Sequence, residues 1–159
     1  MAEWDEWYLL RTRPRQEARA VENLENQGFF CYCPMLKKRS GRIEALFPGY
    51  MFLRADHNEA DELPWQKVRS TRGVMGFVRF GISEPRRLPM GLVEALQERE
   101  RIMGTVPDYK PGQTVTFKSG PFAELDGIYL QDKGENRCII LITILNRQQA
   151  INAEQVALY

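Results

Sequence analysis

The sequence predicts an α+β fold in which helices pack on a mainly antiparallel sheet, followed by a smaller second module. In the first hundred residues the patterns run strand, helix, strand, strand, and then a further strand and helix. Glycine and proline then interrupt the chain without any periodicity. We therefore expect an N-terminal domain at 1–102, a linker at 103–110 and a C-terminal domain at 111–159.

Each element of the first domain has its own signal. Bulky residues at 7–10 predict a strand at 6–12, and apolar side chains at helical spacing before Gly28 predict a helix at 15–27. The other expected elements are strands at 29–35, 43–55 and 74–80, a basic loop at 37–42, a short helix within 56–67 and a helix at 89–103.

The third strand contains a segment, 46–53, that is apolar on both faces. After a Pro-Gly turn, Tyr50 and Phe52 share one face of the strand, while Met51 and Leu53 share the other. One face serves the core. The other face is either covered by a second layer or forms an aromatic docking surface for another protein.

A row of polar side chains lies along the exposed side of the first expected helix. Arg15 and Arg19 are four residues apart, and Asn23 extends the row by another turn. This row is either a solvated face or, together with Arg13, a ridge that contacts phosphates.

The C-terminal module contains a segment whose secondary structure the pattern leaves open. Six of the eight residues at 138–145 are Ile or Leu, so neither a period of two nor one of 3.6 stands out. β-Branching favours a strand, and a helix buried against a partner is the alternative. Alternation at 114–117 predicts another strand, with turns at 120–121 and 126–127.

Composition limits the class of protein. Of the 159 residues, 43% are hydrophobic and 27% charged, as in an ordinary soluble globular chain. No apolar run approaches the ~20 residues of a membrane span, and the acidic N-terminus lacks a hydrophobic signal core. We expect a cytoplasmic protein with no membrane contact. With a net charge of +1, any nucleic-acid contact must come from a local patch.

The sequence shows no constellation for catalysis or metal binding. Cys31, Cys33, Cys138 and the single histidine, His57, match no usual zinc spacing, so we expect buried thiols that act as small hydrophobes. No phosphate-binding glycine loop, nucleophile elbow or metalloprotease helix is present. We expect neither an enzyme nor a cofactor.

Several segments together resemble the NusG family of transcription elongation factors, and among its subtypes the specialised RfaH-type antiterminators most. They are Trp-Tyr-Leu-Leu at 7–10, the segment 46–53, Thr-Arg-Gly-Val at 71–74, and the segments 77–81, 111–115 and 120–122. They occur in family order and span nearly the whole chain.

The resemblance implies a set of partners and roles. The N-terminal domain would bind RNA polymerase, and one face of it the non-template DNA strand. The C-terminal domain would be a KOW-type β-barrel or, as in RfaH, a helical hairpin packed on the N-terminal domain. It would recruit a ribosomal protein or the termination factor Rho, and the protein would be a monomer.

The resemblance also assigns these roles to residues. RNA polymerase would contact Tyr50, Phe52 and Phe80, and DNA would contact Arg13, Arg19, Asn23, Thr71 and Arg72. An interdomain ion pair would join Glu44 to Arg137. The apolar surface of the C-terminal domain would comprise Tyr129, Ile139, Ile142 and Leu145.

Two alternatives stay open. Gly127 stands where the KOW signature places its glycine, which fits a general or operon-specific NusG paralogue without autoinhibition. The second alternative is a KOW-bearing, ribosome-associated RNA-binding protein. Such a protein is expected to be far more basic than this chain.

Overall fold

The computed structural model describes residues 7–38, 40–54, 65–78, 88–89, 91–103 and 123–157. These residues form two compact units. The sheet unit contains the described residues of 1–34 and 47–90, and the hairpin–helix unit contains those of 35–46 and 91–159. The predicted domain boundaries at 102 and 111 stay a prediction. Phe80, His57 and the expected strand at 114–117 lie outside the described residues.

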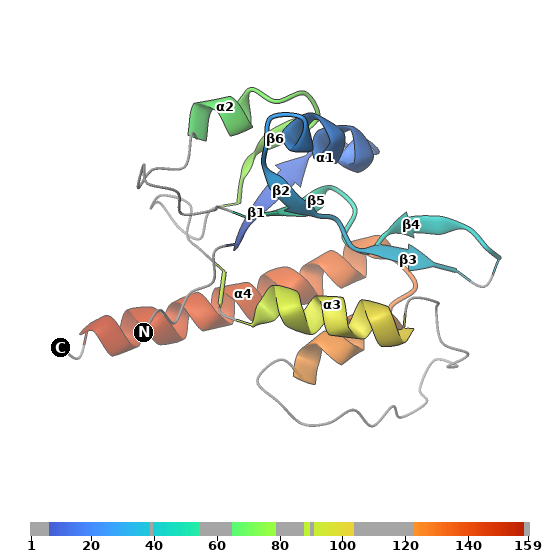
Figure 1. Ribbon diagram of the computed structural model, residues 1–159. Coiled ribbons are helices and arrows are strands. Elements are labelled where there is room, and N and C mark those ends of the chain that lie inside the picture. Colours follow the sequence, from blue (N-terminus) through green and yellow to red (C-terminus); the bar gives the residue numbers. More distant parts are fainter. Residues whose placement is uncertain are drawn as a thin grey trace. The chain divides into compact units, whose positions relative to one another are not determined.

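The sheet unit is built on a four-stranded sheet (Figure 1). Its strands are β1 (Trp7–Thr12), β2 (Phe30–Tyr32), β5 (Tyr50–Arg54) and β6 (Val74–Phe77), in the order β2-β5-β1-β6. Every neighbouring pair is antiparallel. The prediction of a mainly antiparallel sheet in an α+β N-terminal region is therefore confirmed.

Helices α1 (Glu17–Glu25) and α2 (Trp65–Arg69) complete this unit. From α1, Ala20 and Leu24 are buried in a core cluster against one face of the sheet. The other buried members of this cluster are Leu10, Met51, Leu53, Val68 and Val74. The helix stops near the predicted place because Gly28 has a φ of +92°, a conformation that suits glycine.

Two expected strands are each divided in the structure. The expected strand at 29–35 becomes β2 and β3 (Met35–Lys37), because Pro34 has no N–H to donate to a ladder. The expected strand at 43–55 becomes β4 (Ile43–Ala45) and β5. They are separated by the Pro-Gly turn, where Gly49 has a φ of +84°. The short helix expected within 56–67 is also displaced, since α2 ends at residue 69.

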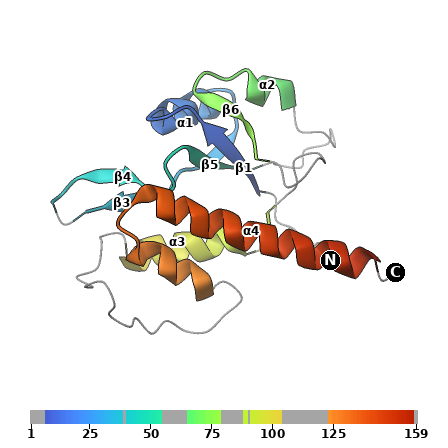
Figure 2. The ribbon, with the colours of Figure 1, turned by 180° about the vertical axis from the view of Figure 1, so that it is seen from behind.

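The hairpin–helix unit combines β3 and β4 with three helical elements. The two strands pair antiparallel, and the helices are α3 (Leu92–Met103), the 3₁₀ element η1 (Ala123–Leu130) and α4 (Gly134–Ala157). Figures 1 and 2 show α3 running alongside α4, with the hairpin near the N-terminal end of α4. No described helix has the length and apolar character needed to cross a membrane.

The ambiguous segment at 138–145 lies within α4, so its strand alternative is not what the structure has. Burial now follows a helical period. Arg137, Leu141, Ile144 and Leu145 are buried, whereas Ile139 is exposed. The turn expected at 126–127 is likewise part of η1 rather than of a barrel.

Candidate functional site

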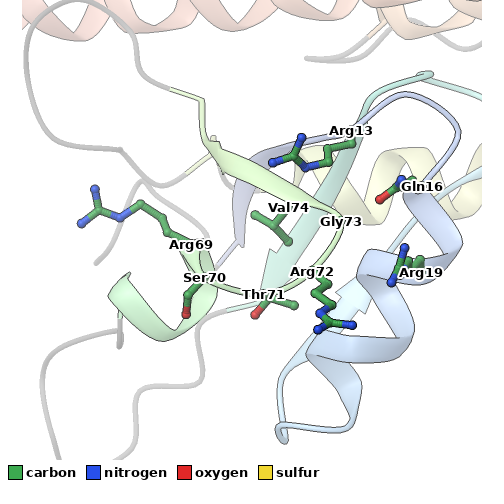
Figure 3. A pocket seen from close by; sticks show the side chains of 9 residues that line it. All are labelled: Arg13, Gln16, Arg19, Arg69, Ser70, Thr71, Arg72, Gly73 and Val74. Carbon is green, nitrogen blue, oxygen red and sulfur yellow. The ribbon is translucent and has the colours of Figure 1, made fainter.

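The sheet unit carries a cavity of about 370 Å³ whose lining is rich in arginine (Figure 3). It is lined by Arg13, Gln16, Arg19 and residues 69–74. We call it the arginine pocket. Four arginines contribute to its lining, namely Arg13, Arg19, Arg69 and Arg72, and all four are exposed. In Figure 3 the side chain of Arg69 extends away from the other three. No acidic residue is among the lining residues, so the pocket is suited to an anion.

Three separate segments bring these arginines together. Arg13 follows β1 in a turn, Arg19 projects from α1, and Arg69 and Arg72 come from the end of α2 and the loop after it. The turn after β1 is tight. Gln16 donates its backbone N–H to the Arg13 carbonyl oxygen at 3.0 Å, and Arg15 has a φ of +62°. A residue with a side chain seldom takes that conformation.

The loop at 71–73 packs directly on α1. Gly73 has a φ of +96°, and a Cβ atom at this position would lie 3.0 Å from the Ala20 nitrogen. The Gly73 carbonyl oxygen accepts the Arg13 backbone N–H at 2.8 Å. This close approach, which only glycine permits, sets Arg72 beside α1 and the turn that holds Arg13.

The predicted DNA-contacting residues do not all have the same place in this site. Arg13, Arg19, Thr71 and Arg72 line the pocket, whereas Asn23 does not. The Asn23 side-chain amide instead donates to the Arg72 carbonyl oxygen at 3.2 Å. Thr71 is only 6% exposed. Arg15, part of the ridge considered from the sequence, is not among the lining residues.

Sequence reasoning missed Arg69, Gln16 and Ser70 as pocket residues. Arg69 lies three residues before Arg72 in the sequence. This pair of nearby arginines was the signal that could have predicted Arg69 as a pocket residue. Their approach to Arg13 and Arg19 depends on contacts between residues about fifty positions apart, which no local pattern reveals.

Two of the predicted polymerase-docking residues, Tyr50 and Phe52, lie on the face of the sheet opposite the core cluster. In the register, Phe52 pairs with Leu9 and Tyr50 with Arg11. Tyr50 is half-buried, and the Arg11 guanidinium carbon lies 5.8 Å from the centroid of its ring. Phe52, by contrast, is fully buried.

Two neighbouring rings of the sheet unit contact Phe52. Tyr32 stacks on it with ring centroids 5.9 Å apart, and Phe47 meets it edge-on at 6.3 Å. This pair of contacts makes Phe52 part of an aromatic cluster in this conformation. Its third predicted companion, Phe80, is outside the described residues.

In the hairpin–helix unit, Arg137 is completely buried. Its Nε donates to the Leu46 carbonyl oxygen at 2.7 Å. Its Nη1 donates to the carbonyl oxygens of Gln131 and Asp132 at 2.9 and 2.8 Å, and its Nη2 donates to that of Ala45 at 3.4 Å. The guanidinium thereby ties the end of the hairpin to the segment before α4.

Glu44 meets this guanidinium at the edge of the same contact. Its Oε2 lies 3.4 Å from Nη2 of Arg137, and its Oε1 lies 2.9 Å from Nζ of Lys38. Lys38 also reaches Oδ1 of Asp132 at 3.1 Å. Glu44 and Asp132 together raise the pKa of Lys38, and Lys38 lowers the pKa of Asp132. We call these four residues the hairpin clasp.

The predicted C-terminal apolar surface is not one exposed surface in this conformation. Tyr129 and Leu145 are buried, Ile142 is half-buried and Ile139 is 62% exposed. Burial raises the pKa of Tyr129.

The cysteines are half-buried rather than fully buried, so the expectation of buried thiols holds only in part. Cys31 and Cys33 pack against the core cluster, and burial raises the pKa of the Cys31 thiol to about 12. Among the described residues, no three metal-binding side chains come close enough together to hold an ion.

Comparison with known proteins gives consistent matches. The NusG protein of Thermus thermophilus, a transcription termination/antitermination protein, is 28% identical over 175 residues, covering 94% of this chain and 95% of that protein. The Escherichia coli K12 protein of the same name is also 28% identical, over 68% of this chain and 61% of its own length. A solved structure of Thermotoga maritima NusG shares 26% identity, covers 72% of this chain and 68% of the other, and has a TM-score of 0.44.

The family model supplies the decisive finding. The model described as transcription termination factor NusG matches residues 5–97, which is more than half of the chain. The chain belongs to the NusG family of transcription termination/antitermination factors, which are not enzymes.

Proposed function

We propose that this protein is an elongation and antitermination factor that binds RNA polymerase and contacts the non-template DNA strand through the arginine pocket. The pocket is the observation that carries the proposal. Four exposed arginines contribute to its lining, which contains no acidic residue, on a chain whose net charge is only +1. Such a local concentration of cations attracts a polyanion by releasing its counterions.

The pocket suits nucleic-acid phosphates better than a small metabolite. Guanidinium groups bind phosphate oxygens in a planar, bidentate way. Here they come from separate segments around an open site, as a backbone that passes along the surface requires. The same near-neutral net charge disfavours the ribosome-associated alternative, which would need a broad basic surface.

Polymerase binding would use the aromatic face of the sheet. Of the three predicted anchors, Tyr50 is half-buried and Phe52 is buried. An anchor residue must be accessible to fill a pocket on its partner. Docking through Phe52 therefore requires a conformation in which its ring is uncovered, and Tyr50 is the better first contact.

We also propose an RfaH-like resting state, in which the C-terminal segment is helical and restrains docking. The support comes from inside the hairpin–helix unit. There, residues 44–46, which belong to the predicted N-terminal domain, bind Arg137 of the C-terminal segment. The alternative is a general or operon-specific paralogue without this restraint. Recruitment of a ribosomal protein or Rho, a cytoplasmic location and a monomeric state without a cofactor are parts of the same proposal.

The DNA contact is tested by measuring single-stranded DNA binding over a range of salt concentrations. Arg19→Ala and Arg72→Ala should each weaken binding and lower the slope of log affinity against log salt by about one unit per lost phosphate contact. Arg101→Ala, at an exposed arginine in the other unit, is the matched control. Wild-type salt dependence in both pocket variants would overturn the proposal.

Polymerase binding needs its own experiment. Tyr50→Ala should weaken binding to purified RNA polymerase by ~2–4 kcal/mol if this residue is a hot spot, and the melting temperature must stay unchanged. Glu44→Ala should strengthen the same binding if the C-terminal segment restrains docking. Equal affinity for wild type and Glu44→Ala would favour the paralogue without autoinhibition.

A further inference from the structure

The 71–73 loop is hydrogen-bonded to both helices of the sheet unit. From α1, the Asn23 side chain donates to the Arg72 carbonyl oxygen at 3.2 Å. The Gln27 side chain, just beyond α1, donates to Oγ1 of Thr71 at 2.8 Å. From the side of α2, the carbonyl oxygen of Val68 accepts the backbone N–H of Thr71 at 3.1 Å. We call Asn23 and Gln27 the amide strut.

Gln27 uses both N–H groups of its side-chain amide in this arrangement. Its Nε2 also donates to the Asn23 backbone carbonyl oxygen at 3.0 Å, so both amide hydrogens have acceptors. Thr71 links Gln27 to α2, because its hydroxyl also donates to the Lys67 carbonyl oxygen at 2.9 Å. The hydroxyl proton of Thr71 is thus used within the protein, and the residue is only 6% exposed. Thr71 is therefore poorly placed to donate to a ligand.

A fixed loop matters because the pocket brings like charges into one lining. Four arginines line one cavity, and none of its lining residues is acidic. Like charges that share a site repel one another, and Arg72 transmits this repulsion to the 71–73 loop that carries it. Hydrogen bonds from uncharged amides oppose displacement of this loop without neutralising the cations. The pocket keeps both its shape and its charge.

We propose that Gln27 is a positioning residue for nucleic-acid binding. It acts through Thr71 to hold Arg72 in reach of a phosphate, and it does not touch the nucleic acid itself. Asn23 acts in the same way through the Arg72 backbone. This inference rests on the proposed function of the arginine pocket, and it reassigns Thr71 and Asn23 from contacting residues to supporting ones.

The test is Gln27→Met, which keeps the length of the side chain and removes both hydrogen bonds. Binding of a single-stranded oligonucleotide to the full chain should weaken about three- to tenfold, the range expected for losing a hydrogen bond that orders a binding group. The salt slope should fall toward that of Arg72→Ala. Gln66→Met, at an exposed glutamine on α2, is the matched control and should bind as wild type does.

Two comparisons separate positioning from a general loss of structure. In the Arg72→Ala background, Gln27→Met should cost almost no further affinity, because its effect passes through Arg72. Additive losses would show that Gln27 acts elsewhere and would overturn the inference. Thr71→Val should reproduce the Gln27→Met effect, and the two changes combined should be no worse than either one.

Amide hydrogen exchange in the free protein supplies a readout that does not depend on DNA. The backbone N–H groups of Arg13 and Val74 donate to Gly73 and Thr71 at 2.8 and 3.1 Å, so both report on the loop. Their exchange should accelerate in Gln27→Met and not in Gln66→Met. Unchanged exchange would overturn the inference.

The DNA-binding measurements distinguish failure of this inference from failure of the proposed function. If Arg72→Ala changes the salt dependence but Gln27→Met does not, only the inference about Gln27 fails. If Arg72→Ala has no effect, the proposed function fails.

Discussion

Arg72 and Arg137 show two opposite uses of the same side chain. Arg72 is exposed, shares its pocket with three other arginines, and is held through its backbone by Gly73 and the amide strut. Arg137 is fully buried, and its guanidinium donates to four carbonyl oxygens and faces Glu44. A buried charge that is hydrogen-bonded inside the protein is costly to remove, because its partners are then left unpaired. A charge that faces solvent is available to a ligand.

The comparison predicts that the two arginines differ most in stability. Arg137→Met should destabilise the hairpin–helix unit by about 3–5 kcal/mol, because it leaves buried carbonyl oxygens without their donor and removes one of the two cations that face the Glu44 carboxylate. Arg72→Met should change stability by no more than about 0.5 kcal/mol, as surface substitutions usually do. Chemical denaturation followed by circular dichroism measures both. Equal stability of the two variants would contradict the distinction.

Gly73→Ala tests the other half of the comparison, namely that the pocket depends on its backbone. A Cβ atom would lie 3.0 Å from the Ala20 nitrogen at a φ of +96°, so we expect a loss of about 2–4 kcal/mol from strain and overpacking. DNA affinity should also fall, since Arg72 moves with the loop.

Gly41→Ala is the matched control for this substitution. Gly41 has a φ of +88° but no heavy atom within 4 Å of the added Cβ. Its cost should therefore be the conformational part alone. A Gly73→Ala variant no less stable than Gly41→Ala would show that the contact with α1 is not tight.

Much of this molecule was predictable from local signals, and the exceptions have physical causes. The strands at β1, β5 and β6 and the helix α1 follow from period and punctuation. The segment 138–145 could not be assigned because nearly every position is apolar, so the sequence leaves the buried side to be chosen by packing. Likewise, alternation places Tyr50 and Phe52 on one face, but it does not reveal that Phe52 is buried while Tyr50 is partly exposed.

The candidate site also contains residues that local signals single out and residues that they do not. Arg13, Arg19 and Arg72 were predicted from spacing and family resemblance, whereas Gln27 was not predicted at all. Its partner Thr71 is 44 residues away in the sequence, and a glutamine after a helix has many ordinary explanations. Only the folded arrangement shows that both amide N–H groups have acceptors.

Glu44→Gln should have a moderate effect on the hairpin–helix unit. Arg137 keeps its four carbonyl contacts when the carboxylate is removed, and the Glu44–Arg137 distance of 3.4 Å is long for a charge-assisted hydrogen bond. We expect a loss of about 1 kcal/mol, well below that of Arg137→Met. A loss as large as that of Arg137→Met would show that the carboxylate, rather than the carbonyl oxygens, holds the guanidinium.

Lys38→Met should have the smallest effect, because the ion pairs of Lys38 with Glu44 and Asp132 are open to solvent, with 24% and 90% of the two carboxylate side chains exposed. We expect a loss of roughly 0–1 kcal/mol, which high salt should remove by screening.

The pH dependence of this effect follows from the pKa shifts of Asp132 and Lys38. The pKa of Asp132 is lowered in the folded state, so this part of the stability is present above the ordinary aspartate pKa of 3.8 and disappears as the pH falls below it. The pKa of Lys38 is raised, so its part persists at neutral pH and is lost only as the pH rises above 10.5. The difference in stability between wild type and Lys38→Met should therefore be largest between these limits at low salt. A difference that survives high salt would mean that Lys38 stabilises the hairpin by packing of its methylene groups, and would place it with Arg137 as a structural residue.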